Sequence, residues 1–158
     1  MNKALLRDHI LGALRAELDR QRQAALLARD EAISEESRAE NKYDTHSQEA
    51  AYLAEGQAKL AAGIGEAIKL YETLPLPDFA PGAPAAIGAL VEVAGRGGDR
   101  WYFLGPRSGG LELEIDGAPV LVLTPQSPLG RHLLGRRAGD RLPEPGGAGG
   151  AMRIVAVL

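Results

Sequence analysis

The chain is 158 residues long, with a formal net charge of −3, a hydrophobic content of 45% and an aromatic content of only 4%. Free nucleic acid is an unfavourable main partner because phosphate binding needs a basic surface, and the absence of cysteine excludes disulfides and thiolate metal sites. No segment approaches the roughly 18 consecutive apolar residues of a membrane span, and charges interrupt the N-terminus too early for a signal peptide. We therefore expect a cytoplasmic protein.

The first half of the sequence, up to about residue 74, contains no proline and is rich in good helix formers. It carries two apolar stripes with the three- and four-residue spacing of a helix face. The first stripe comprises Leu6, Ile10, Ala13, Leu14 and Leu18, continued by Ala25, Ala28 and Ala32. The second comprises Leu53, Gln57, Leu60, Ile64, Ile68 and Tyr71.

Residues 34–47, between the two stripes, are almost entirely polar. Two amphipathic helices around a polar break predict an antiparallel helical hairpin, a coiled coil, over residues 1–74. Each helix would have roughly 30 residues and a length of ~45 Å. The alternative is one continuous helix in a parallel dimer, which would place polar residues over about two heptads of its seam.

The pattern changes from residue 75 onward. A proline-rich linker is predicted over residues 75–86, because a helix does not continue through Pro75, Pro77, Pro81 and Pro84. In residues 87–158, short apolar runs at 89–93, 101–104, 111–115, 120–123 and 153–157 predict strands. One short helix is predicted over residues 129–134, after Ser127-Pro128 and before Gly135. The predicted fold class is α+β: a helical hairpin followed by a small, mostly antiparallel sheet with one helix.

The sequence around this short helix resembles the C-terminal signature of the Gre-factor family (GreA and GreB). The matching residues are Ser127-Pro128-Leu129-Gly130-Arg131, Leu133-Leu134-Gly135 and Gly139-Asp140. The run 103–106 resembles a strand end of that family, and the run 152–157 resembles its closing strand. A helical hairpin precedes this domain in the family, so the resemblance covers nearly the whole chain. It implies an FKBP-like C-terminal domain without isomerase activity.

The resemblance also implies bacterial RNA polymerase as the partner. In the family, the C-terminal domain grips the rim of the polymerase secondary channel, and the hairpin descends toward the active site. The residues that we expect to bind the partner are Pro125, Gln126, Ser127, Pro128, Leu129 and Arg131. Ser127 can cap a helix that begins at Pro128, which would present a rigid turn. A helix cap with no docking role is the simpler alternative, and we expect Leu133 and Leu134 to be ordinary core residues.

Catalytic members of the family carry two acids at the hairpin tip, which help to hold a second Mg²⁺ and a water at the polymerase active site. In this sequence Asp44 matches the first acid, but Ser47 stands where the second is expected, and Glu49 lies five residues after Asp44. The accessory catalytic candidates are therefore Asp44 and Glu49. The candidates for transient Mg²⁺ binding, in the polymerase complex only, are Asp44, Glu49 and Glu40. A solvated helix turn would have a similar composition, so that interpretation stays open.

The leading hypothesis is a monomeric transcription elongation factor that binds at the secondary channel and modulates elongation or pausing. It would not be an enzyme and would have no cofactor of its own, since any transcript cleavage would use the chemistry and the Mg²⁺ of the polymerase. No direct sequence-specific contact with nucleic acid is expected. The displaced second acid supports an alternative, a channel-blocking competitor of Gre factors.

Two further alternatives are weaker. An FKBP-type isomerase needs an aromatic-lined pocket, whereas Trp101, Tyr102 and Phe103 alternate between the two faces of one predicted strand. A plain coiled-coil assembly protein would form a stable dimer and would have no affinity for polymerase.

Overall fold

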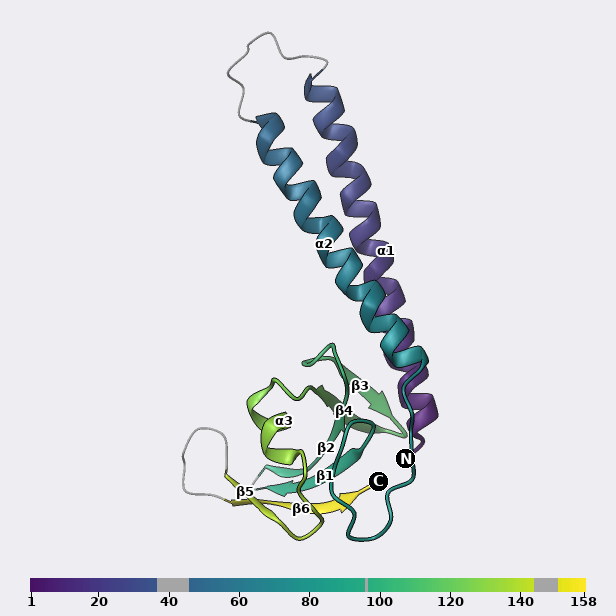
Figure 1. The fold of residues 1–158 in the computed structure, drawn as a ribbon, viewed down its shortest axis with the longest axis vertical. Helices are drawn as coiled ribbons and strands as arrows, with labels where there is room; N and C mark the ends of the chain where they lie inside the picture. The colour runs from purple at the N-terminus through teal and green to yellow at the C-terminus, as the bar shows by residue number, and fades with distance from the viewer. Residues whose placement is uncertain (37–45, 96, 144–150) are drawn as a thin grey trace. The chain divides into compact units, whose positions relative to one another are not determined.

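The computed structural model describes residues 1–36, 46–95, 97–143 and 151–158. The chain divides into two compact units (Figure 1): residues Met1–Ile10 together with Leu70–Leu158 form one, and residues Leu11–Lys69 form the other. The predicted domain limits at residues 74 and 86 both fall inside the first unit, and as domain limits they stay predictions.

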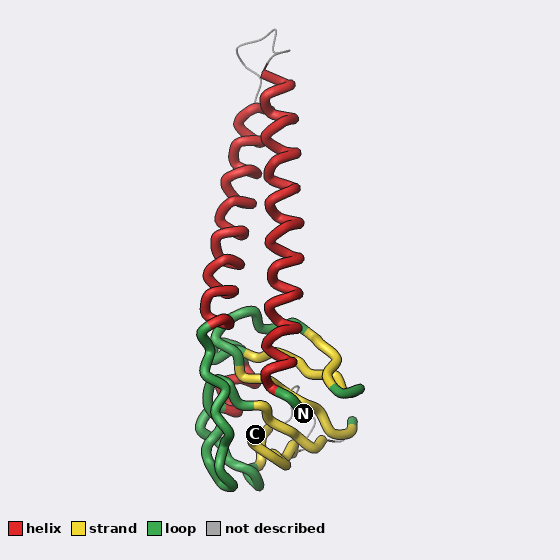
Figure 2. The backbone as a smooth tube through the Cα atoms, turned by 90° about the vertical axis from the view of Figure 1, so that its right-hand side faces the viewer, coloured by secondary structure: helices red, strands yellow, loops and turns green. Residues whose placement is uncertain are grey.

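Two long helices, α1 (Lys3–Glu36) and α2 (His46–Glu72), account for the N-terminal part of the chain. They lie side by side in both views and run in opposite directions (Figures 1 and 2), as the predicted helical hairpin requires. The start of α1 is capped by Asn2, whose side-chain oxygen accepts hydrogen bonds from the amides of Ala4, at 2.9 Å, and Leu5, at 3.2 Å. This cap satisfies donors that the first helical turn leaves without an intrahelical partner.

The predicted stripe on α1 is confirmed except at Ala32, whose side chain lies outside the described part of the structure, whereas the stripe on α2 is partly wrong. The predicted positions that are buried or half-buried on α1 are Leu6, Ile10, Ala13, Leu14, Leu18, Ala25 and Ala28. Those on α2 are Gln57, Ile64, Ile68 and Tyr71. In contrast, Leu53 and Leu60 are 58% and 59% exposed, and the half-buried positions beside them are Ala54 and Ala61. Both series have helical spacing, so spacing alone cannot choose between a leucine and the alanine that follows it.

The second part of the chain forms one six-stranded sheet with the strand order β3-β4-β2-β1-β6-β5. Its strands are β1 (Leu90–Gly95), β2 (Gly98–Leu104), β3 (Glu112–Ile115), β4 (Ala118–Leu123), β5 (Arg141–Pro143) and β6 (Ala151–Val157). Neighbouring strands are antiparallel except β2 and β4, which are parallel. The predicted α+β class and the mostly antiparallel sheet are confirmed. The parallel pair and β5 were not predicted.

Both faces of the sheet are covered. The helix α3 (Pro128–Leu133) lies over one face (Figure 1), and its Leu133 belongs to a buried cluster with Val91, Tyr102, Leu104 and Ile154. Side chains of successive strand residues point to opposite faces, so Phe103 and Val122 point away from this cluster, yet both have no exposed surface. Tyr71, at the end of α2, lies on that second face close to Val122 and Gly105.

The predicted linker over residues 75–86 is tied to the sheet domain. Ala85 is 2% exposed and forms two backbone hydrogen bonds to the segment after α3, one from its amide to the Arg136 carbonyl at 2.7 Å and one to its carbonyl from the Gly135 amide at 2.8 Å. Phe79 packs against the core cluster, and the Lys3 ammonium lies 5.0 Å from the centre of the Phe79 ring, within cation–π range. These contacts fix the path of the segment across the domain.

Candidate functional site

The turn that leads into α3, which we call the α3 turn (residues 124–128), is held by three hydrogen bonds. The Ser127 amide and the Ser127 hydroxyl both donate to the Thr124 carbonyl, at 3.0 and 2.8 Å, and the hydroxyl oxygen accepts from the Gly130 amide at 3.1 Å. Pro128 occupies the first helical position, where its missing N–H costs nothing. The cap predicted from Ser127-Pro128 is therefore present, and Gly135, with φ at 76°, follows the end of the helix as expected.

Only a residue without a side chain fits at position 130, which is occupied by Gly130. A Cβ atom placed there would lie less than 3.0 Å from the Thr124 carbonyl oxygen and 2.6 Å from the Ser127 hydroxyl. Carbon atoms pack at about 3.5–4.0 Å from their neighbours, so the turn and the helix could not keep their present positions. Close packing therefore explains why the sequence motif has a glycine at this position.

The six residues predicted to bind the partner all lie on the α3 turn or the first helical turn, but they differ in accessibility. Gln126, Pro128 and Arg131 are exposed, while Pro125 and Ser127 are half-buried. Leu129 is also half-buried and packs against the core cluster, so it can present only part of its side chain to a partner. Leu133 is fully buried, and Leu134 packs against the same cluster, which places both leucines in the core as expected.

A polar hollow of about 410 Å³ adjoins the α3 turn. It is lined by Pro106, Arg107, Ser108, Gly109, Thr124 and Gln126. Thr124 and Gln126 belong to the α3 turn, so the hollow and the exposed turn form one continuous surface. Residues 107–109 were not predicted as part of a site. The signal available was the Gly109-Gly110 pair after a strand, which indicates a turn but not a cavity.

Tyr71 supports the loop that forms the hollow. Its side chain is fully buried, and its hydroxyl donates a hydrogen bond to the Arg107 carbonyl at 2.7 Å. Burial raises the pKa of Tyr71 well above its ordinary value, which favours the protonated hydroxyl that donates this hydrogen bond. A Cβ atom at position 105 would lie less than 3.0 Å from this hydroxyl, so Gly105 leaves the space that Tyr71 occupies.

The predicted acidic tip falls mostly outside the described residues. Asp44 and Glu40 lie outside the described ranges. The structure therefore does not test whether the three candidate Mg²⁺ ligands come together. Glu49 is exposed in the first turn of α2. In the described ranges, no group of three His, Cys, Asp or Glu residues is placed to hold a metal ion. The accessory role of the tip acids therefore stays a prediction.

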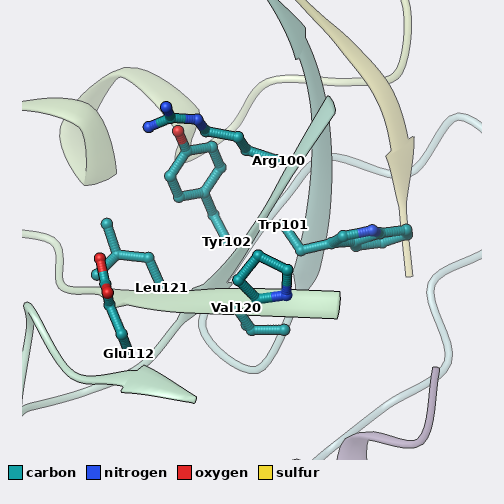
Figure 3. A pocket seen from close by; sticks show the side chains of 7 residues that line it. Arg100, Trp101, Tyr102, Glu112, Val120 and Leu121 are labelled. Carbon is teal, nitrogen blue, oxygen red and sulfur yellow. The ribbon is translucent and has the colours of Figure 1, made fainter. Parts of the chain in front are cut away.

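A second, smaller hollow of about 290 Å³ lies over β2, β3 and β4 (Figure 3), and Tyr102 and Trp101 are among its lining residues. Figure 3 shows Arg100 and Tyr102 on one side of β2 and Trp101 on the other. The two aromatic rings thus lie on opposite sides of β2, as the alternation along the predicted strand indicates. That the chain is not an enzyme stays a prediction.

The matches between this chain and known proteins come from solved structures. No protein-family model matches the chain, and no curated protein matches it. The part of the chain that the structure describes contains no helix long and apolar enough to cross a membrane.

Solved structures of Gre-type factors do match. GreA factor homolog 1 (Gfh1) of Thermus thermophilus is 22% identical, with 94% of each chain covered and a TM-score of 0.36. Gfh1 of Thermus aquaticus is 20% identical, with 92% of each chain covered and a TM-score of 0.35. The elongation factor GreA/GreB of Nitrosomonas europaea is 24% identical over 65% of this chain and 78% of its own, with a TM-score of 0.35. The chain is thus similar to solved Gre-type transcription factors, in the case of Gfh1 over more than nine tenths of its length.

Proposed function

We propose that the chain binds bacterial RNA polymerase at the secondary channel, through the α3 turn, and modulates transcription elongation or pausing. The observation that carries the proposal is the α3 turn itself, where the Gre-like motif forms a capped, close-packed turn with Gln126 and Pro128 exposed. A surface that is rigid before binding loses little conformational entropy when a partner docks. The action would take place in the cytoplasm, on a polymerase that supplies any catalytic chemistry.

A pull-down with core RNA polymerase tests the docking turn. We expect the Ser127→Glu/Pro128→Ala double variant to bind at least about tenfold more weakly than the wild type, because it breaks the cap and adds a charge at the contact. A matched control is Pro84→Ala/Ala86→Glu, which makes the same kinds of change at two exposed positions of the 75–86 segment. Equal binding by all three proteins would reject the α3 turn as the docking element, and no binding by the wild type would reject the proposed function.

The role of the tip is tested by transcript cleavage in stalled elongation complexes. If the chain stimulates cleavage, Asp44→Ala should reduce the stimulation by at least about tenfold, the scale on which groups around a metal affect its binding. Asp30→Ala, a neutralisation of an exposed acid on α1, is the matched control. Strong cleavage that survives Asp44→Ala would contradict the role of Asp44.

The absence of a second acid at position 47 favours the channel-blocking alternative. That alternative predicts slower elongation with no added cleavage, and reduced cleavage when a Gre factor is also present. The same stalled complexes, supplied with the wild-type chain before the Gre factor, distinguish the two modes.

A further inference from the structure

We infer that the polar hollow beside the α3 turn is a receptor for a carboxylate side chain of the docking partner. This inference rests on the proposed function, because it assigns a contact within the same docking surface. It adds residues 107–109, which carry no part of the Gre-like motif, and it names the chemistry that they recognise.

The chemistry of the lining selects an anion. The charged residue that lines the hollow is Arg107, and the other polar side chains are the hydroxyls of Ser108 and Thr124 and the amide of Gln126. All of these groups can donate hydrogen bonds. The arginine guanidinium also matches a carboxylate with two parallel N–H donors, which gives geometric selectivity as well as attraction. Among the residues that the structure describes, no acidic side chain lines the hollow to oppose an incoming carboxylate.

The hollow is also built before any partner arrives. The chain on both sides of its loop is tied to β4: the Gly105 amide donates to the Leu123 carbonyl at 2.8 Å, and the Gly110 amide donates to the Val122 carbonyl at 2.8 Å. Between these ties, Tyr71 holds the Arg107 carbonyl. Ser108 adopts a left-handed conformation with φ at 62°, which a non-glycine residue rarely adopts unless its surroundings impose it.

The position of the hollow identifies the source of the carboxylate. Gln126 belongs both to the lining and to the exposed part of the α3 turn, so a protein that covers the turn also covers the mouth of the hollow. At about 410 Å³, the space admits an aspartate or glutamate side chain together with water. We therefore expect an acidic residue of RNA polymerase to enter it when the α3 turn docks.

Two measurements with the full chain and core RNA polymerase test this inference. In a fluorescence-anisotropy titration, Arg107→Glu should weaken binding by at least about 30-fold, as expected when one partner of a desolvated ion pair is replaced. Arg107→Lys should weaken it only a few-fold, because the charge remains and the two-donor geometry is lost. Arg141→Glu is the matched control, since it makes the same change of charge at an exposed residue of β5, at the edge of the sheet opposite β3.

The second measurement does not depend on a loss of binding. Because the chain has no cysteine, Ser108→Cys introduces a single thiol at the hollow. Maleimide labelling of this thiol should slow at least about tenfold in the polymerase complex, since a docked partner covers the mouth of the hollow, whereas the exposed Ala86→Cys control should label at its free rate.

The outcomes separate the inference from the proposed function. Wild-type binding, combined with normal affinity of Arg107→Glu and unchanged labelling of the Ser108→Cys thiol in the complex, would overturn the carboxylate receptor and leave the proposed function standing. No binding by the wild type would overturn both.

Discussion

Gly130→Ala is expected to lower the free energy of unfolding by about 3 kcal/mol, a large loss for a single methyl group. The added Cβ would lie less than 3.0 Å from the Thr124 carbonyl oxygen, a backbone atom that cannot turn aside as a side chain can. The helix α3 would have to shift away from the α3 turn, and this would disturb the hydrogen bond between the Gly130 amide and the Ser127 hydroxyl. Urea-induced unfolding followed by circular dichroism measures the loss.

The matched control is Gly12→Ala, because nothing beyond its chain neighbours and the adjoining backbone of α1 lies within 4 Å of the position that its Cβ would occupy. Alanine is favoured over glycine inside a helix by about 0.8–1.0 kcal/mol, so this variant should be as stable as the wild type or more stable. Equal stability of the two variants would show that the α3 turn can relax around a methyl group, and it would remove the packing explanation for Gly130.

How well the sequence predicts this fold depends on whether the signal is local. The cap at Ser127, the start of α3 at Pro128 and its end at Gly135 depend on neighbouring residues, and all three are where the sequence indicates. The Asp116-Gly117 pair is also a local signal, because Asp-Gly between two apolar runs favours a tight hairpin turn. Both residues have the positive φ, 54° and 77°, that such a turn requires.

Features that depend on distant partners were harder to predict. β5 has only three residues, one of them Pro143, and exists because it pairs with β6. The parallel pairing of β2 with β4 places Trp101 beside Val120, a relation that no spacing within either strand reveals. The same limit explains the wrong prediction on α2. Leu53 and the alanine after it have equivalent helical spacing, so spacing alone does not show which of them is buried.

The candidate site shows both cases at once. Ser127 and Pro128 were found because the cap and the motif are continuous in sequence. The hollow was missed because its lining joins residues 106–109 to Thr124 and Gln126 through the pairing of β2 with β4. Its support by Tyr71 crosses an even larger separation, 36 residues, to the Arg107 carbonyl.

This long-range support leads to a second prediction with a large effect, a non-additive pair of substitutions. Gly105→Ala alone should lower the free energy of unfolding by about 3 kcal/mol, because its Cβ would clash with the Tyr71 hydroxyl. Tyr71→Phe alone should lower it by about 1–2 kcal/mol, since the Arg107 carbonyl loses its donor. In the double variant the hydroxyl is gone, and the nearest ring carbon would lie 3.1 Å from the new Cβ, a distance that a small shift can relieve.

The double variant should therefore be about 2 kcal/mol more stable than the sum of the two single losses predicts, within the range measured for residues in contact. Urea unfolding of the four proteins of this double-mutant cycle measures the coupling. Gly63→Ala combined with Tyr71→Phe is the control cycle, because nothing beyond the chain neighbours and the adjoining backbone of α2 lies within 4 Å of the Gly63 Cβ position, which is two helical turns from Tyr71. The effects of these two substitutions should add. Additive losses for Gly105 and Tyr71 would mean that the hydroxyl does not fill the space above Gly105, and the loop around Arg107 would then need a different support.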